Sequence, residues 1–243
     1  MKIAKIVLAF CTLVLISTAC ADQPVFKNPG LPEKIKMTAW DYVNKKEGFV
    51  KADISATVRE VSGKKYFYIE STEGKYFKNC MTLNYETLTP VEEQRFDLRA
   101  GKLIESIKIT DNTVHFFHAG KNIDMNVNTN ERNIYSRYSY FFSMCGFPFE
   151  TAKEVHYLSY MFEYGNALEL RATNLGKVRI KVKAGTFDCY KLEVAVGGWQ
   201  APFAPDKYFL YFTVAQPHYF VKFDQKVEDG KWLSNELMSY NSK

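Results

Sequence analysis

The four histidines are the residues of this chain best suited to metal ligation or acid–base chemistry, but their spacing keeps them apart. His115 and His118 enclose two phenylalanines in a strand-like run, and this odd separation places the two side chains on opposite faces of a strand. His156 and His218 each stand alone. Because no compact cluster of cysteine and histidine accompanies them, the sequence predicts no metal site and no cofactor.

Short motifs for nucleophilic or phosphate chemistry give no better candidate. No Gly-x-Ser-x-Gly elbow is present. Residues 72–75 (TEGK) lack the first glycine of a phosphate-binding loop and indicate a turn. Glu92, Glu93 and Glu154 are separated acids without a visible partner, and we expect them in solvated positions. The sequence therefore predicts a protein that is not an enzyme and has no catalytic residues. The open alternative is a hydrolase with a dispersed active site, built around one of the histidines beside an acid.

The N-terminus has the pattern of a bacterial export signal. Lys2 and Lys5 precede an apolar run over residues 6–16, which is too short to span a bilayer comfortably. The small residues that follow predict cleavage after Ala21 and a periplasmic location. The alternative is lipidation of Cys20, which would anchor the protein to the outer membrane as a lipoprotein.

The signal peptide occupies residues 1–21, and the remaining residues 22–243 have the length of a single β domain. Removal of Lys2 and Lys5 lowers the formal net charge from +5 to +3, an excess too small to predict a nucleic-acid partner. We expect no transmembrane span in the mature chain. Aromatic residues make up 16% of the sequence, which indicates either an aromatic core between pleated faces or an apolar cavity for a lipid.

Alternation of apolar and polar residues with a period of two dominates the mature chain. Val178, Ile180 and Val182 alternate with basic residues, residues 184–186 form a turn, and the alternation then resumes. Residues 207–215 are apolar on both faces, which predicts a strand covered on both sides, by a second layer or by a bound molecule. The fold class is therefore mainly β, with a single curved antiparallel sheet or incomplete barrel of about eleven or twelve strands.

Two segments break this rhythm. Residues 133–147 place Ile134, Tyr138 and Phe141 at helical spacing and predict one short apolar helix packed on the sheet as a lid. Residues 197–205 form a loop rich in glycine and proline that carries Trp199. Either segment could seal a filled core or lie at the mouth of a ligand cavity.

Three cysteines remain after processing: Cys80, Cys145 and Cys189. An odd number allows one disulfide with a free thiol, or no disulfide at all. All three lie in apolar strings, where a buried free cysteine is the common outcome.

Several short motifs resemble an exported bacterial family described only as a domain of unknown function. They are TLTP at 87–90, FPF at 147–149, AGTF-x-x-YKLE at 184–193 and PHY at 217–219. In strand layout that family is similar to the periplasmic lipoprotein carriers and their outer-membrane receptors. The resemblance implies a strongly curved antiparallel sheet wrapped around helices, with acyl chains held on its concave face. It implies no catalytic or binding residue for this chain.

These features predict a non-enzymatic cell-envelope protein that binds or transfers a hydrophobic ligand, such as a lipid or acyl chain, on the concave face of the sheet. The alternative is an envelope interaction or scaffold module with a filled core and a protein partner. We expect ligand contacts from the helix, the proline-rich loop and the doubly apolar strand, at Tyr138, Phe141, Phe142, Trp199, Phe209 and Tyr211.

Overall fold

The structure, a computed structural model, describes residues 25–43, 47–110, 113–128, 134–161, 166–198, 201, 207–226 and 232–242. The expected signal peptide lies outside these residues. Fifteen strands are described, with short helical turns after β7 and β9. The elements are β1 (Lys34–Val43), β2 (Glu47–Val61), β3 (Lys64–Glu73), β4 (Phe77–Asn84), β5 (Pro90–Asp97), β6 (Lys102–Thr110), β7 (Thr113–His118), η1 (Ala119–Lys121), β8 (Ile123–Asn128), β9 (Ile134–Ser136), η2 (Arg137–Ser139), α1 (Tyr140–Ser143), η3 (Met144–Gly146), β10 (Glu154–Met161), β11 (Asn166–Val182), β12 (Gly185–Val196), β13 (Lys207–Thr213), β14 (Phe220–Lys226) and β15 (Trp232–Ser242).

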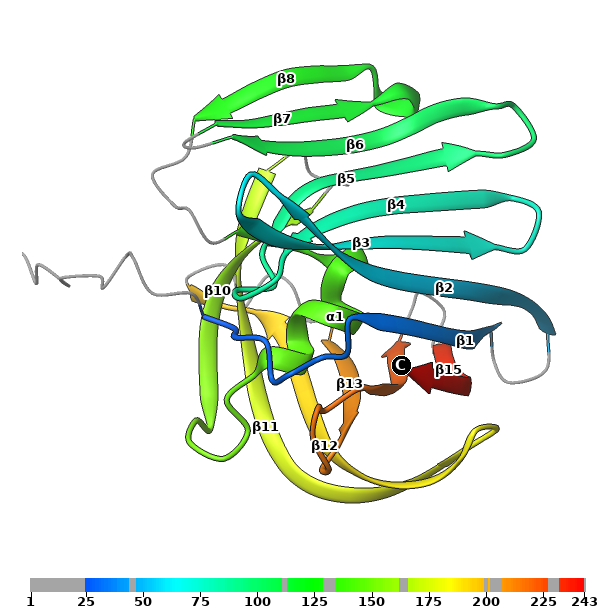
Figure 1. Cartoon of the computed structure of the whole chain (residues 1–243), viewed down its shortest axis with the longest axis vertical. Coiled ribbons are helices and arrows are strands. Elements are labelled where there is room, and N and C mark those ends of the chain that lie inside the picture. Colours follow the sequence, from blue (N-terminus) through cyan, green and yellow to red (C-terminus); the bar gives the residue numbers. More distant parts are fainter. Residues whose placement is uncertain are drawn as a thin grey trace, which may run out of the picture.

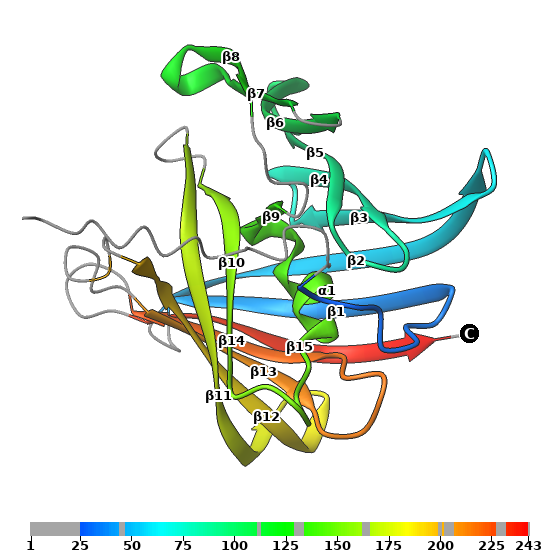
Figure 2. The ribbon, with the colours of Figure 1, turned by 90° about the vertical axis from the view of Figure 1, so that its left-hand side faces the viewer.

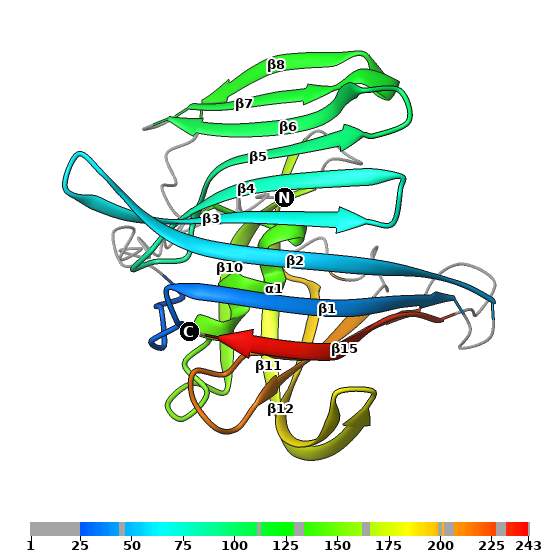
Figure 3. The same ribbon diagram turned by 45° about the vertical axis from the view of Figure 1, so that its right-hand side comes forward.

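All fifteen strands belong to one sheet, in the order β8-β7-β6-β5-β4-β3-β2-β1-β15-β14-β13-β12-β11-β10-β9. Neighbours pair antiparallel except for β9 and β10, which pair parallel. Figures 1 and 3 show the long hairpins of this sheet, and Figure 2 shows its two sides curving around α1. The predicted mainly β fold with one curved sheet and one short helix is confirmed. The sheet is wider than expected because even the short runs at its edges pair as strands.

The segment of residues 134–147 is less helical than the sequence predicts. Ile134 lies in β9 and pairs with Leu158 of β10, so the expected helical face does not extend to it. The α-helix itself covers only Tyr140–Ser143, between two turns of 3-10 helix. Among the described residues, no helix has the length and apolar character needed to cross a membrane.

The first described residues tie this helical segment to the sheet. The backbone nitrogen of Lys27 donates to the carbonyl oxygen of Gly146 at 3.2 Å, and that of Asn28 donates to Glu86 at 2.8 Å. A Cβ atom at Gly146 would lie 2.4 Å from the Lys27 carbonyl oxygen, so only glycine fits this crossing. Phe26 is fully buried and anchors the crossing in the core.

The main hydrophobic core lies between the concave face and the helical segment, and a smaller cluster lies under β6 and β7. All three described cysteines are free. Cys145 and Cys189 are buried, as predicted, whereas Cys80 is only half-buried, because its side chain lies on the outer face of β4.

Candidate functional site

A cavity of about 550 Å³ lies between the concave face of the sheet and the helical segment. Its volume is within the range of small-molecule binding sites. Strands β2–β6 form one wall, β13–β15 form another, and η2 with α1 covers the space between them. The lining residues are Ala52, Ile54, Ser71, Glu73, Phe77, Asn79, Met81, Arg95, Ile104, Glu105, Tyr138, Tyr140, Phe141, Phe142, Tyr208, Phe223, Gln225, Leu233 and Asn235.

One side of the cavity is mostly apolar and aromatic. Phe141 of α1 stacks on Phe220 of β14, with ring centroids 3.9 Å apart, and also contacts the ring of Phe223. Phe142 is buried, and Tyr208 packs against Phe223. This wall offers a surface suited to an alkyl chain or another apolar group.

The other side is polar because strand register aligns polar residues across the sheet. Ser71 of β3 pairs with Asn79 of β4, and Asn79 pairs with Arg95 of β5. Arg95 in turn pairs with Glu105 of β6, which pairs with His118 of β7. These five residues therefore form one row on the concave face, although they are far apart in the sequence.

Arg95 is held rigidly within this row. Its two terminal nitrogens donate to the two carboxylate oxygens of Glu73, each at 2.9 Å, and Nη1 also donates to Oδ1 of Asn79 at 2.9 Å. Asn79 Nδ2 donates to the same carboxylate at 2.8 Å. The guanidinium also lies 4.2 Å from the ring centroid of Phe77. The charge of Arg95 is thus matched by Glu73.

Glu105 is the carboxylate that belongs to this row. The hydroxyl of Tyr138 donates to Oε2 of Glu105 at 2.7 Å, and Nε2 of His118 lies 3.4 Å from Oε1. Tyr138 therefore links the helical segment to the polar end of the cavity. His115 lies on the opposite face of β7, where it contacts Asp124, so the predicted separation of His115 and His118 is confirmed.

Glu93 is buried, which contradicts the expectation of a solvated acid. Only 2% of the residue is exposed. It occupies the next row of the concave face, paired with Met81 on β4 and Ile107 on β6. Burial raises the pKa of its carboxyl group to about 7. The hydroxyls of Ser136 and Ser139 act in the opposite direction, although neither stands in hydrogen-bond geometry with the carboxyl group.

The predicted contact residues fall into three groups. Tyr138, Phe141 and Phe142 line the cavity. Phe209 and Tyr211 lie on the other face of β13, where the amino group of Lys191 covers their rings at 4.2 and 5.8 Å from the centroids. The outer face of this doubly apolar strand is therefore covered by side chains of other strands of the same sheet. Trp199 lies outside the described residues.

The sequence reasoning missed the polar end altogether. Alternation within residues 92–98 shows that Glu93 and Arg95 share one face, but it does not show that this face is concave. Glu73 lies at the end of β3, where the sequence indicates a turn. Only the pairing of β3 with β4 and of β4 with β5 brings these side chains together.

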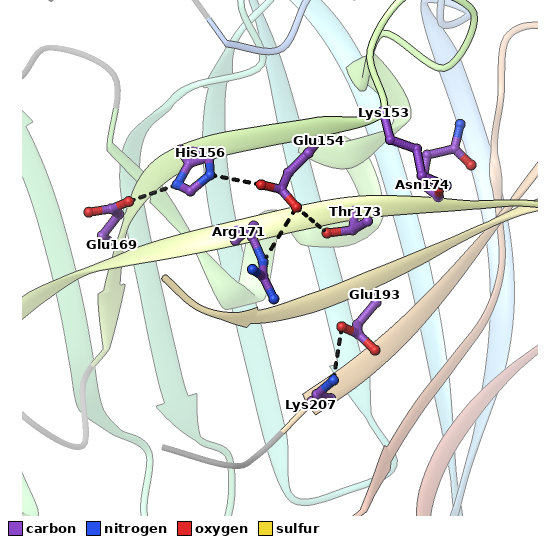
Figure 4. Close-up of polar contacts among 9 residues, drawn as sticks. All are labelled: Lys153, Glu154, His156, Glu169, Arg171, Thr173, Asn174, Glu193 and Lys207. Carbon is purple, nitrogen blue, oxygen red and sulfur yellow. Dashed lines mark hydrogen bonds and ion pairs between the residues drawn. The ribbon is translucent and has the colours of Figure 1, made fainter. Parts of the chain in front are cut away.

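A second polar cluster lies on the outer surface of β10 and β11 (Figure 4). His156, expected to be isolated, contacts Glu169 at 2.7 Å and Glu154 at 3.0 Å. Glu154 is exposed as expected, but it also accepts a hydrogen bond from Thr173 and contacts Arg171. The expectation that His156 and Glu154 lack partners is wrong, because pairing of β10 with β11 places these side chains side by side.

The surroundings of His218 indicate a structural role. It is buried beside Phe149 and Tyr190, and its Nδ1 donates to the carbonyl oxygen of Thr213 at 2.9 Å. Within the part of the chain that the structure describes, no group of three His, Cys, Asp or Glu side chains could hold a metal ion.

No protein-family model matches the chain, and no curated protein matches it in sequence. Among solved structures, it is similar to a β-barrel-like protein of the domain of unknown function DUF1849 from Brucella abortus, with a TM-score of 0.47 and 7% identity over 87% of this chain and 97% of that chain. The hypothetical lipoprotein YmcC from Escherichia coli gives 0.30 and 9%, over 86% of this chain and 85% of that chain. A LolA superfamily protein from Nitrosomonas europaea gives 0.25 and 8%, over 87% of each chain.

Proposed function

We propose that this chain is a non-enzymatic protein of the bacterial cell envelope that binds, or passes on, an amphiphilic molecule in the cavity under the concave face. The observation that carries the proposal is the cavity itself, which combines an aromatic wall at Phe141 and Tyr208 with a polar end at Arg95 and Glu105. A molecule with one apolar part and one polar part is complementary to such a space.

The energetics favour a ligand with an alkyl chain. Each CH₂ group transferred from water into an apolar site gains about 0.8 kcal/mol. A chain lying along Phe141 and Phe223, beside the buried Phe142, would replace water against rings that are already fixed by packing. The side chains thus need little additional ordering when the ligand binds.

The N-terminal pattern supports a location in the cell envelope. Cleavage after Ala21 would release the protein into the periplasm, whereas lipidation of Cys20 would hold it at the outer membrane. In both locations the protein meets lipids and other amphiphiles. A hydrophobic ligand is therefore available to it in either case.

The first test is native mass spectrometry of the processed protein, purified from a bacterial envelope without detergent. We expect a discrete adduct of lipid mass that is lost on denaturation. The mass of the bare protein also distinguishes cleavage after Ala21 from lipidation at Cys20. A bare protein that also fails to bind a fluorescent fatty acid would refute the proposal and favour the scaffold alternative.

A pair of variants tests whether the ligand binds in this cavity. Ala52 lines the cavity, whereas Ser55 lies on the opposite face of the same strand. We expect Ala52→Phe to place a ring inside the cavity and weaken binding at least about tenfold, a loss of about 1.4 kcal/mol. Ser55→Phe should bind as the unaltered protein does. Equal binding by both variants would exclude this cavity as the site.

A further inference from the structure

The polar end of the cavity carries more acid than base. Glu73, Glu93 and Glu105 lie there, and the guanidinium of Arg95 is the cation that lines this end within the described residues. Arg95 is already paired with Glu73 through both terminal nitrogens. Glu93 and Glu105 therefore remain without a full cationic partner, apart from the contact of Glu105 with His118.

The carboxyl group of Glu93 is the unusual member of this set. It is buried, and among the described residues neither of its oxygens has a hydrogen-bond partner. A buried polar group without a partner destabilises a fold, and it does so more strongly when it is charged. Such a group at the edge of a cavity is a mark of a binding site.

Glu93 lines a small chamber that adjoins the main cavity. The chamber has a volume of about 10 Å³, and five side chains line both spaces: Asn79, Met81, Arg95, Glu105 and Tyr138. This volume is close to that needed for a single water molecule. A primary ammonium group is of similar size, whereas a phosphate or a trimethylammonium group is much larger.

The hydrogen bonds made by the side chains that line the chamber indicate that a group bound there would be a hydrogen-bond donor. Arg95 donates to Glu73 and Asn79, the Asn79 amide donates to Glu73, and the Tyr138 hydroxyl donates to Glu105. These donors are thus engaged. Of the two hydroxyls whose proximity lowers the pKa of Glu93, that of Ser139 donates to the carbonyl oxygen of Ser136 at 2.9 Å, and neither hydroxyl stands in hydrogen-bond geometry with the carboxyl oxygens. An ammonium group has three donors and no acceptor, which complements this arrangement.

We propose that the polar end is a subsite for a primary ammonium group, with Glu93 and Glu105 as its acceptors, and that the amphiphile bound in the cavity carries an amine head group. This inference rests on the proposed function, because the apolar chain of the amphiphile occupies the main cavity. The charge of Arg95 does not oppose the ammonium group strongly, since Glu73 neutralises it at 2.9 Å.

The test compares four amphiphiles with the same ten-carbon chain: decylamine, decan-1-ol, decanoate and decyltrimethylammonium. Each displaces the neutral fluorescent probe N-phenyl-1-naphthylamine at pH 7, below the concentration at which the amphiphile self-associates. We expect decylamine to bind about tenfold more tightly than decan-1-ol, because charge-assisted hydrogen bonds favour it. Decyltrimethylammonium has the same charge but no donor and should show no such gain. Tightest binding of decanoate, or equal binding of both cations, would overturn the proposal.

Variants assign the preference to Glu93. We expect Glu93→Gln to abolish the preference for decylamine over decan-1-ol. The control is Glu92→Gln, because Glu92 precedes Glu93 in the chain but lies on the other face of β5. A preference that survives in E93Q would contradict the assignment.

The possible failures are distinguishable. If decan-1-ol and decylamine bind equally, the ammonium subsite is wrong and the hydrophobic site stands. If none of the four amphiphiles binds, the proposed function is wrong and the subsite with it. Should E93Q not fold by circular dichroism, Glu105→Gln provides the second variant, and retention of the full amine preference in it would count against the subsite.

Discussion

Two acidic clusters on the same sheet hold their carboxyl groups in opposite environments. The outer cluster consists of Glu154, His156, Glu169 and Arg171, and the inner cluster consists of Glu73, Glu93 and Glu105. Glu154, on the outer face, is exposed, and hydrogen bonds from His156 and Thr173 hold its pKa below the usual range. Glu93, on the concave face, is buried beside Met81 and Ile107, and burial raises its pKa to about 7. Residues of the same type thus differ because one is exposed and accepts hydrogen bonds, whereas the other is buried among apolar side chains.

The comparison shows where the fold tolerates an unfavourable arrangement. The outer cluster in Figure 4 is a network of exposed ion pairs, each of which contributes little to stability in water. The inner cluster has a similar number of acids in a setting where each unmatched charge is costly. A destabilising group next to a cavity is compensated most directly by a ligand, which is why we assign function to the inner cluster.

The largest expected effect is at the Arg95–Glu73 pair. Arg95→Met would leave the Glu73 carboxylate, whose side chain is 24% exposed, without its cation. We expect a loss of about 3 kcal/mol in the free energy of unfolding, measured by urea denaturation, because removal of one partner leaves a largely buried charge unmatched.

The matched control for this change lies in the outer cluster. Arg171 contacts Glu154 at 3.6 Å, with side chains 38% and 39% exposed. Arg171→Met should therefore destabilise by less than about 1 kcal/mol. Equal losses at the two arginines would show that burial does not separate the two clusters.

The second effect is the dependence of stability on pH set by Glu93. Its pKa in the folded protein, about 7, lies above the ordinary value of 4.5, so the folded state retains a proton that the unfolded state has lost. The free energy of unfolding should therefore fall as pH rises from about 4.5 to about 7 and stay level above that. The full change is about 3 kcal/mol for this group.

Glu93→Gln removes this titration and should make the protein more stable than the parent at pH 8, with little difference at pH 4. Chemical denaturation of both proteins across this range measures the difference. Glu92→Gln serves as the control from the opposite face of β5 and should leave the pH profile unchanged. A profile in E93Q that still falls between pH 4.5 and 7 would place the titrating group elsewhere.

The sequence was sufficient for the fold class and for the part of the cavity lining that comes from the helical segment, whereas the predicted Phe209 and Tyr211 lie on the other face of β13. Alternation with a period of two marks most strands, and the aromatic run of residues 138–142 does cover the cavity. The helix at 133–147 was overestimated because Ile134 fits a helical face equally well in sequence, while pairing with Leu158 places it in a strand.

The polar half could not be predicted because it depends on long-range register. Glu93 has the sequence context of an ordinary solvated acid, since Glu92 and Gln94 flank it. Its burial follows from the alignment of β5 with Met81 on one side and Ile107 on the other. For Glu154 the expectation of exposure is correct, but the expectation that it lacks partners is wrong. Its partners His156 and Arg171 come close to it only when β10 pairs with β11.

The smallest expected effect is at His156 in the outer cluster. Hydrogen bonds to Glu169 and Glu154 raise its pKa above the ordinary value of 6.5, so the stabilisation they give is complete below that value and is lost as pH rises through the folded-state pKa. The lowered pKa of Glu154 limits the effect on the acid side, since this carboxylate must remain ionised. His156→Gln should therefore destabilise by about 0.5 kcal/mol or less near pH 5.5, because the imidazole is half-exposed and screened by salt. The difference should vanish by pH 9 and shrink in 1 M salt. A loss as large as that in R95M would mean that the outer cluster also depends on burial, and the contrast between the two clusters would then fail.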